Sequence, residues 1–275
     1  MTDPSDIPAA QVRPDPDTAR IDAARAESAP ADAGSGRPVA LVSLLPNLVT
    51  ILGLCFGLTS IRYAFADRWE LAGGLLVLAA VIDGMDGLLA RRLNAASPFG
   101  AELDSLSDFV CFGVAPAMLV YHFGLEGLAG LGWVAALTFA ICCCLRLARF
   151  NVAAKEETNE AGSFTGVPAP AGAMLGLFPV SLFLSGVWDT REAEWLIALW
   201  MLAVGAMMIA RFRTISLKKM KVSRDNAVWV LLGAAVVIGL MLTRLWTFHV
   251  GATFLYLGLL AWGVAGRGRR RRGGA

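Results

Sequence analysis

Charged residues are scarce in this chain of 275 residues, since Asp, Glu, Lys and Arg make up 17% and hydrophobic residues 56%. Soluble domains are nearer 25% charged and 45–50% apolar. The charges also cluster between apolar runs of about 20 residues, the length that crosses a bilayer core as a helix. This pattern excludes a soluble enzyme, and the lack of ~10-residue alternating segments excludes a transmembrane β-barrel. It predicts an all-α, polytopic helical membrane protein.

The chain also lacks the cysteine patterns of zinc sites and disulfide frameworks. It has five cysteines and no C-x-x-C pair, and all five cysteines lie within apolar runs. Cys142, Cys143 and Cys144 are consecutive, so on a helix they point about 100° apart and cannot form one metal site. We interpret the cysteines as small hydrophobic residues in lipid or at helix contacts.

Residues 1–40 have almost no large apolar side chains and are rich in Ala, Asp, Pro, Arg and Ser. Such a segment cannot bury enough surface to offset its ordering entropy, which predicts a disordered N-terminal tail. It lacks the basic start and immediate apolar core of a secretory signal, so we expect the first hydrophobic run to be a retained anchor.

About eight transmembrane helices are predicted after this tail. The expected spans are 47–66, 70–91, 101–121, 128–148, 168–187, 194–212, 226–243 and 246–265. Twenty of the 24 Lys and Arg residues fall on one side of these spans. The positive-inside rule therefore places both termini in the cytoplasm.

Carboxylates stand at the ends of two neighbouring spans, although a carboxylate within a spanning helix is unfavourable. Asp83 and Asp86 are i, i+3, and Asp104 and Asp108 are i, i+4, so each pair occupies one helix face. A short connection makes the two spans antiparallel, so both pairs should reach the same cytoplasmic level. Four carboxylates there would repel one another unless divalent cations lay between them. Ligation by oxygen alone suits Mg²⁺ or Mn²⁺ rather than zinc.

Spacing alone leaves two other interpretations open. The acids could form an ion or proton pathway, or they could be structural ion pairs with Arg91 and Arg92. The lack of charges deep in the last four spans weighs against a relay across the membrane. Gly84, Gly87 and Ala90 remove side-chain bulk beside the acids, which allows close helix approach or access for a ligand.

Written as a pattern, this stretch is Asp83-x2-Asp86-Gly87-x2-Ala90-Arg91-x8-Gly100-x3-Asp104-x3-Asp108. All eight specified positions match, so the stretch resembles the signature of the CDP-alcohol phosphatidyltransferase family. Residues 45–50 (Leu-Pro-Asn-Leu-Val-Thr) are similar to the start of the family's first helix. Leu145–Asn151 and Phe164–Pro170 resemble the phosphatidylserine synthase branch, and the likeness covers about residues 41–225.

The resemblance implies transfer of a phosphatidyl group from CDP-diacylglycerol to an alcohol, with release of CMP and with two divalent metals as cofactors. It implies that Asp83, Asp86 and Asp104 are the principal metal ligands and that Asp108 is both a ligand and the general base. Elementary chemistry agrees, because two metals can clamp an in-line displacement. A carboxylate near the acceptor hydroxyl can also take its proton.

The same resemblance implies a binding site for CDP-diacylglycerol. Gly87 and Ala90 would flank the cytidine, Arg91 would meet the diphosphate, and Gly100 belongs to the same signature.

The alcohol is expected to bind near the end of the fourth span, on the same side as the aspartates. Arg146, Arg149 and Asn151 lie there, and an arginine can bind the carboxylate of serine through two hydrogen bonds. Plain positive-inside anchoring remains an alternative for both arginines. The Gly- and Pro-rich segment Phe164–Pro170 is predicted to be a re-entrant or loop segment before the fifth span, placed to line the acceptor pocket.

The predicted domains are a tail (1–40), a catalytic membrane domain with spans one to six (41–225), two further helices (226–265) and a basic tail (266–275). We expect an integral protein of the inner, cytoplasmic membrane, with its active site facing the cytoplasm and with L-serine as the acceptor. The basic segments 211–224 and 267–272 indicate contact with anionic lipid rather than nucleic acid. The resemblance also implies a homodimer. The alternatives are a sister enzyme using glycerol 3-phosphate, inositol phosphate or choline, and a divalent-cation or proton-coupled transporter.

Overall fold

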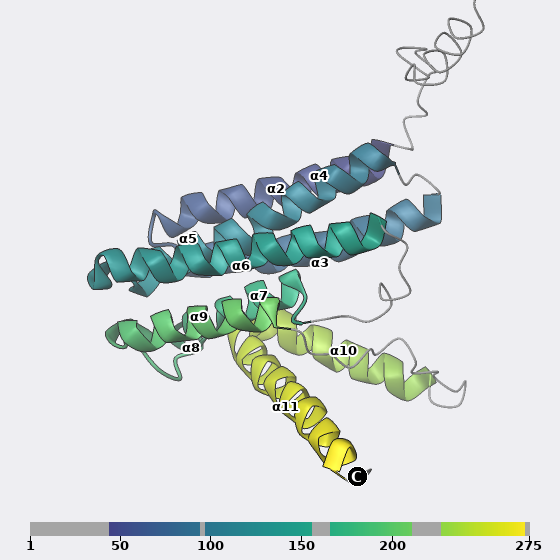
Figure 1. Cartoon of the computed structure of the whole chain (residues 1–275). Helices are drawn as coiled ribbons and strands as arrows, with labels where there is room; N and C mark the ends of the chain where they lie inside the picture. The colour runs from purple at the N-terminus through teal and green to yellow at the C-terminus, as the bar shows by residue number, and fades with distance from the viewer. Residues whose placement is uncertain (1–43, 94–96, 156–165, 211–226, 273–275) are drawn as a thin grey trace, which may run out of the picture. The chain divides into compact units, whose positions relative to one another are not determined.

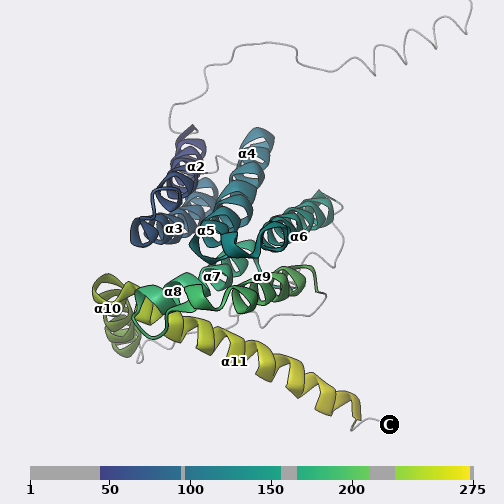
Figure 2. The ribbon, with the colours of Figure 1, turned by 90° about the vertical axis from the view of Figure 1, so that its left-hand side faces the viewer.

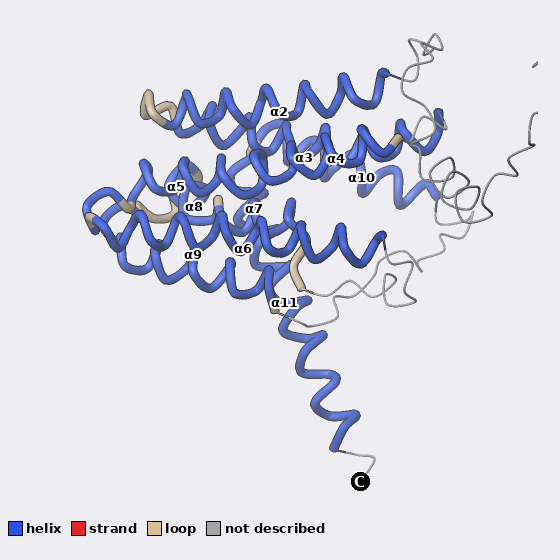
Figure 3. The backbone as a smooth tube through the Cα atoms, turned by 45° about the horizontal axis from the view of Figure 1, so that its top comes forward, coloured by secondary structure: helices blue, strands red, loops and turns tan. Residues whose placement is uncertain are grey.

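The computed structural model describes residues 44–93, 97–155, 166–210 and 227–272. The chain divides into the units Met1–Ala40 and Leu41–Ala275, and every described residue belongs to the second. These residues form helices and connecting loops with no strand among them (Figure 3), so the all-α prediction is confirmed for this part. The predicted tail (1–40) and the basic segment 211–224 lie outside it.

The first four predicted spans correspond to four helical rods. They are α2 (Leu45–Ala64), α3 (Trp69–Leu93), the continuous stretch of α4 (Pro98–Asp108), η2 (Phe109–Val114) and α5 (Ala115–Gly124), and α6 (Gly130–Lys155). The segment η2 is a wider π-helical turn that ends at Val114, two residues before Pro116. Proline has no N–H to donate to the carbonyl four residues earlier, and a π turn changes the hydrogen-bond register at that point.

The fifth predicted span is broken, and this is a difference from the expectation of one helix over 168–187. It consists of α7 (Ala169–Gly176) and α8 (Phe178–Leu184). Pro179 lies in the first turn of α8 and cannot donate to the carbonyl of Leu175. The Trp200 indole Nε1 donates to that carbonyl instead, at 2.7 Å.

The last three predicted spans correspond to α9 (Glu194–Ile209), α10 (Ala227–Thr243) and α11 (Leu245–Arg272). In Figures 1 and 2, α11 is steeply inclined to α2, α6 and α9. Its N-terminal part packs against α8. The helix continues to Arg272, so it includes most of the predicted basic tail 266–275.

Five helical stretches of the described chain are long and apolar enough to cross a membrane. They are Leu45–Ala64, Trp69–Leu89, Pro98–Gly124, Gly130–Ala153 and Leu245–Gly263. The helix α9 is apolar but shorter. These stretches and the family assignment below indicate an integral membrane protein, and the count of eight spans stays a prediction.

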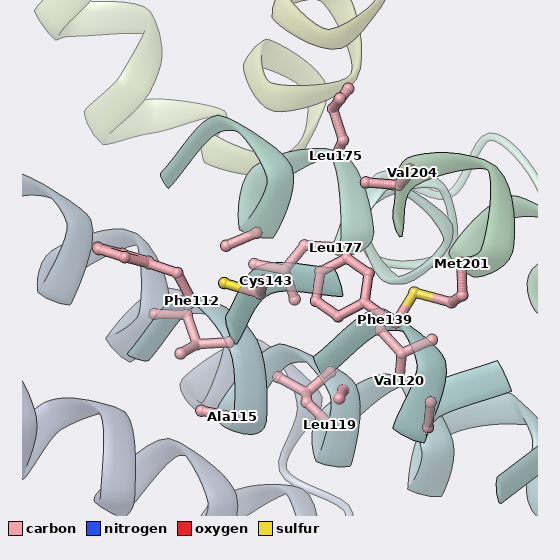
Figure 4. Packing of buried hydrophobic residues seen from close by; sticks show 14 of the residues in the cluster. Phe112, Ala115, Leu119, Val120, Phe139, Cys143, Leu175, Leu177, Met201 and Val204 are labelled. Carbon is pink, nitrogen blue, oxygen red and sulfur yellow. The ribbon is translucent and has the colours of Figure 1, made fainter. Parts of the chain in front are cut away.

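The helices are held together by one apolar core beside the predicted site. Phe112 of η2, Leu119 of α5, Phe139 and Cys143 of α6 and Met201 of α9 lie within it (Figure 4), and all are 3% exposed or less. Cys143 is a free thiol, as are the other four cysteines, which agrees with their interpretation as small hydrophobic residues.

The helix α2 packs closely on the third rod, and glycine makes this approach possible. A Cβ added at Gly57 would lie 2.7 Å from the Cys111 Sγ and 3.3 Å from the Cys111 Cα. The Ser60 hydroxyl of α2 also donates to the Ala72 carbonyl of α3 at 2.7 Å. Both neighbours of α2 carry the aspartates, so α2 is the element that holds the two acidic faces together.

Candidate functional site

Three of the four predicted aspartates converge on one point. Asp83 extends from α3, and Asp104 and Asp108 extend from α4, with Asp108 as the last residue of that helix. One carboxylate oxygen from each of these three residues lies within 4.8 Å of the others, and all three side chains are partly buried. The side chains of Asp83 and Asp108 are also close enough to share a hydrogen bond.

Asp86, the fourth aspartate, lies beside this group and within electrostatic range of Asp83 and Asp104. It is 6% exposed. The Thr50 hydroxyl of α2 donates to its Oδ2 at 2.9 Å and also lies 3.1 Å from the Pro46 carbonyl. Asp86 is therefore held toward α2 by a hydrogen bond that fixes one of its two oxygens.

The helix α2 holds the other acidic face through two further contacts. The Ser107 hydroxyl donates to the Thr50 carbonyl at 3.4 Å, and the Cys111 thiol donates to the Gly53 carbonyl at 3.4 Å. Ser107 comes directly before Asp108 in the chain. Thr50 is thus linked to both acidic helices, through its side chain to α3 and through its carbonyl to α4.

Sequence reasoning missed this role of Thr50. The residue stood in the segment 45–50 that resembles the family's first helix, which was a signal that the segment matters. Nothing in its spacing, however, linked position 50 to Asp86, which is 36 residues away.

The donor set of the three converging aspartates fits a hard divalent cation. Carboxylate oxygens suit Mg²⁺ and Mn²⁺, and none of the soft ligands that select zinc or copper joins the cluster in the described residues. The mutual spacing of the oxygens allows one ion to lie among them. Repulsion among the carboxylates also favours a cation at this point.

The glycines beside the acids leave open space. A Cβ added at Gly84 or Gly87 would meet no atom of the described residues within 4 Å. No described helix therefore approaches closely at these two positions, and access for a ligand stays a prediction. Ala90 and Arg91 continue α3, but their side chains lie outside the described part.

Gly100, the remaining residue of the signature, lies close to side chains of α2 and of its own N-cap. A Cβ there would lie 2.7 Å from the Asn47 Oδ1 and 3.1 Å from the Ser97 Oγ. Ser97 caps α4 by accepting from the Gly100 N–H at 3.0 Å. Gly100 thus allows the first turn of α4 to approach α2.

The three predicted acceptor residues do not share one position. Arg146 of α6 lies within electrostatic range of Asp108, and its Nε donates to the Val167 carbonyl at 2.7 Å. Arg149 is exposed, and its Nη1 donates to the Ile209 carbonyl at the end of α9, at 3.0 Å. Asn151 donates from its Nδ2 to the Ser105 hydroxyl of α4 at 3.0 Å.

The predicted loop 164–170 is described from Gly166 onward, and residues 166–168 agree with the prediction, whereas Ala169 and Pro170 already belong to α7. Gly166 has a φ of 82°, a conformation that favours glycine, and α7 begins only at Ala169. The Val167 N–H donates to the Met207 carbonyl of α9 at 3.2 Å, while the Val167 carbonyl accepts from Arg146. This loop therefore connects Arg146 to α9.

Comparison with known protein families assigns this architecture. Residues 43–207 match the family model described as CDP-alcohol phosphatidyltransferase. The chain belongs to this family. The family resemblance inferred from the aspartate pattern is therefore confirmed, and the matched residues include all four aspartates.

Several curated relatives share one name, CDP-diacylglycerol–serine O-phosphatidyltransferase. The chain is 41% identical over 184 residues to a CDP-diacylglycerol–serine O-phosphatidyltransferase of Mycobacterium leprae and 38% identical over 190 residues to one of Mycobacterium bovis. These alignments cover 65% and 67% of this chain, but they span only 59% and 64% of the length of the two relatives. A protein of that name from Helicobacter pylori is 33% identical, with 82% of this chain and 93% of the relative covered.

The Thr50–Asp86 hydrogen bond gives a prediction about metal binding. We expect Mn²⁺ to raise the melting temperature of the purified protein, and Thr50→Val to weaken the apparent Mn²⁺ affinity about 10- to 100-fold. Removing a partner that orients a metal ligand typically has an effect of this size. Thr50→Ser keeps the hydroxyl and should bind Mn²⁺ nearly as well as the parent.

Thr59→Val is the matched control. Thr59 lies on the same helix, and its hydroxyl donates only to the Cys55 carbonyl, at 2.6 Å. An unchanged Mn²⁺ affinity in Thr50→Val would show that Asp86 needs no orientation by α2.

Proposed function

We propose that this chain transfers a phosphatidyl group from CDP-diacylglycerol to L-serine and produces phosphatidylserine and CMP. The observation that carries the proposal is the convergence of Asp83, Asp104 and Asp108 beside the open space at Gly84 and Gly87. Membership of the family supports the reaction type. The names of the relatives support serine as the acceptor.

In the proposed reaction, Asp83, Asp86 and Asp104 hold divalent Mg²⁺ or Mn²⁺, with Asp108 completing the set. Two bound ions would supply positive charge that screens the diphosphate from the carboxylates and stabilises the transition state. Thr50 keeps Asp86 in place for this task.

Asp108 is the proposed general base. The serine oxygen attacks the phosphorus next to diacylglycerol, the new O–P bond forms, and the bond from that phosphorus to the CMP oxygen breaks. The hydroxyl proton passes to the Asp108 carboxylate, which must lie within hydrogen-bond reach of the serine oxygen. Asp108 suits this task because its carboxylate lies beside those of Asp83 and Asp104 and within electrostatic range of Arg146.

The CDP-diacylglycerol site is proposed to follow the small-residue face of α3. Gly87 and Ala90 would flank the cytidine, and the Arg91 guanidinium would bind the diphosphate. Gly100 would contribute indirectly, because its packing against Asn47 sets the position of α4.

Arg146 is the best placed of the proposed acceptor residues, since it lies within electrostatic range of Asp108. A guanidinium there can bind the serine carboxylate while the serine hydroxyl faces the base. Arg149 and Asn151 would support the acceptor pocket by holding α6 to α9 and to α4.

The proposal includes a cellular setting. We infer that the protein lies in the inner (cytoplasmic) membrane and crosses it eight times, with both termini in the cytoplasm. The active site would face the cytoplasm. The catalytic domain would be residues 41–225, with 226–265 as two additional spans, and the protein would act as a homodimer. Diacylglycerol chains would stay in the lipid while serine and CMP exchange with the cytoplasm.

The first experiment is CMP release by the purified protein in mixed micelles with CDP-diacylglycerol. We expect release with L-serine and Mn²⁺ or Mg²⁺, little release with glycerol 3-phosphate, inositol phosphate or choline, and none in excess chelator. Release that depends on one of the other alcohols would identify a sister enzyme. Full release in chelator would contradict the metal mechanism.

Aspartate substitutions should separate metal binding from proton transfer. Asp104→Asn should abolish both the Mn²⁺-dependent rise in melting temperature and CMP release. Asp108→Asn should keep most CDP-diacylglycerol binding and lose turnover by about 10²- to 10⁴-fold, the usual effect of removing a general base. If Asp108→Asn loses substrate binding together with turnover, the base must be another residue.

Labelling of single cysteines tests the topology. With a membrane-impermeant maleimide, a cysteine at Ser97 should react only from the cytoplasmic face and one at Glu192 only from the outside. Glu192 is exposed, whereas its neighbour Thr190 is buried and donates to the Pro179 carbonyl at 2.8 Å. The parent chain is the control for its own cysteines. Labelling of both positions from one face would refute the inferred orientation.

A further inference from the structure

The helix α11 lies beyond the family match at residues 43–207, and it turns a row of polar side chains toward the bundle. His249 and Thr253 are 8% and 4% exposed, and Tyr256 is partly buried. Their spacing of four and three residues puts them on one helix face. Buried polar side chains in a membrane protein are unfavourable unless they have hydrogen-bonding partners, so such a row indicates a structural or binding role.

The first of these residues is bound to the neighbouring helix. The His249 Nδ1 lies 2.8 Å from the Ser181 hydroxyl of α8, and Trp246 fills the space beside Gly73 of α3. These two contacts fix the start of α11 against α8 and α3. They also determine where the other polar side chains of this row, including Tyr256, lie against the bundle.

Tyr256 has a buried hydroxyl with no hydrogen-bond partner among the described residues. Its side chain packs against the apolar core. An unpaired buried hydroxyl is unfavourable, so a position like this is suited to a ligand that completes the hydrogen bond.

Arg146 provides the second half of the arrangement. The Nε of its guanidinium donates to the Val167 carbonyl, which fixes the orientation of the group. The guanidinium lies within electrostatic range of both the Asp108 carboxylate and the Tyr256 hydroxyl. Arg146 is therefore within electrostatic reach of both the proposed base and α11. Both Arg146 and Tyr256 can donate hydrogen bonds to an oxyanion.

We propose that Tyr256 and Arg146 together bind the carboxylate of the amino-acid acceptor, so that α11 completes the acceptor site. This inference rests on the proposed serine transfer. A serine whose hydroxyl meets Asp108 carries its carboxylate a few bonds away, toward Arg146. In the proposed reaction, the diphosphate of CDP-diacylglycerol binds to the metal ions and to α3 instead, because Asp83, Asp86 and Arg91 belong to that helix. Tyr256 is thus a specificity-determining residue that the family match does not include.

The test is steady-state kinetics of CMP release by Tyr256→Phe in the full-length chain. Loss of one hydrogen bond to a charged group should raise the KM for serine about 10- to 100-fold. The KM for CDP-diacylglycerol and the kcat at saturating serine should stay within about twofold of the parent values. The melting temperature should stay within a few degrees of that of the parent. Tyr121→Phe is the matched control, because Tyr121 is a partly buried tyrosine of α5 that packs on Trp133.

A second acceptor separates a carboxylate site from a general packing effect. Serinol (2-amino-1,3-propanediol) has the amine and hydroxyl of serine but no carboxylate. The KM for serinol should be the same in the parent and in Tyr256→Phe. An equal rise for serine and serinol, or a rise confined to CDP-diacylglycerol, would overturn the assignment, the latter by showing that the oxyanion is the diphosphate.

The outcomes also distinguish this inference from the proposed function. If the parent protein releases CMP with serine and Tyr256→Phe has an unchanged KM for serine, only the role of α11 is wrong. If the parent releases no CMP with serine under any metal condition, the proposed function is wrong, and the carboxylate assignment with it. If Tyr256→Phe melts far below the parent, Tyr256→His serves as the second variant, because its ring can still donate a hydrogen bond. Tyr256→His should then recover the serine KM of the parent. Failure to recover it refutes the proposal.

Discussion

Repulsion among carboxylates that lie at the ends of apolar helices is the constraint on which this structure depends. Asp83, Asp104 and Asp108 bring oxygens within 4.8 Å of one another, with Asp86 buried beside them. Such a group is unfavourable in a membrane protein unless positive charge or hydrogen bonds compensate for it. Thr50 supplies a hydrogen bond to Asp86, and Arg146 supplies positive charge within electrostatic range of Asp108. The carboxylate oxygens also form a set that fits divalent metal ions.

The helix α2 makes this arrangement possible without contributing an acid of its own. It holds α3 through the Ser60 and Thr50 side chains and holds the third rod through Ser107 and the close approach at Gly57. A shift of α2 would therefore move both acidic faces. This explains why the segment 45–50 belongs to the functional part of the chain even though none of its side chains is a proposed metal ligand.

The second half of the chain has a different relation to the site. The family match ends at residue 207, but α11 returns to the bundle, contacts α3 and α8, and brings Tyr256 toward Arg146. The break between α7 and α8, with Trp200 bound to the freed carbonyl of Leu175, leaves Ser181 in place to meet His249. In the proposed enzyme, the common chemistry would come from the matched helices and part of the acceptor selectivity from α11.

The sequence by itself determined the helical membrane class, the helix positions in the first half of the chain and the family, because hydropathy and a spaced acidic signature are local patterns. It also predicted that the two aspartate pairs meet, since short connections make successive spans antiparallel. It did not show the hydrogen bond from Thr50 to Asp86, the packing role of Gly100 against Asn47, or the different partners of Arg146, Arg149 and Asn151. Only the tertiary structure decided these, because each contact joins residues that no short-range period relates. The same reason applies to Tyr256, whose position relative to Arg146 depends on how α11 packs rather than on its place in the chain.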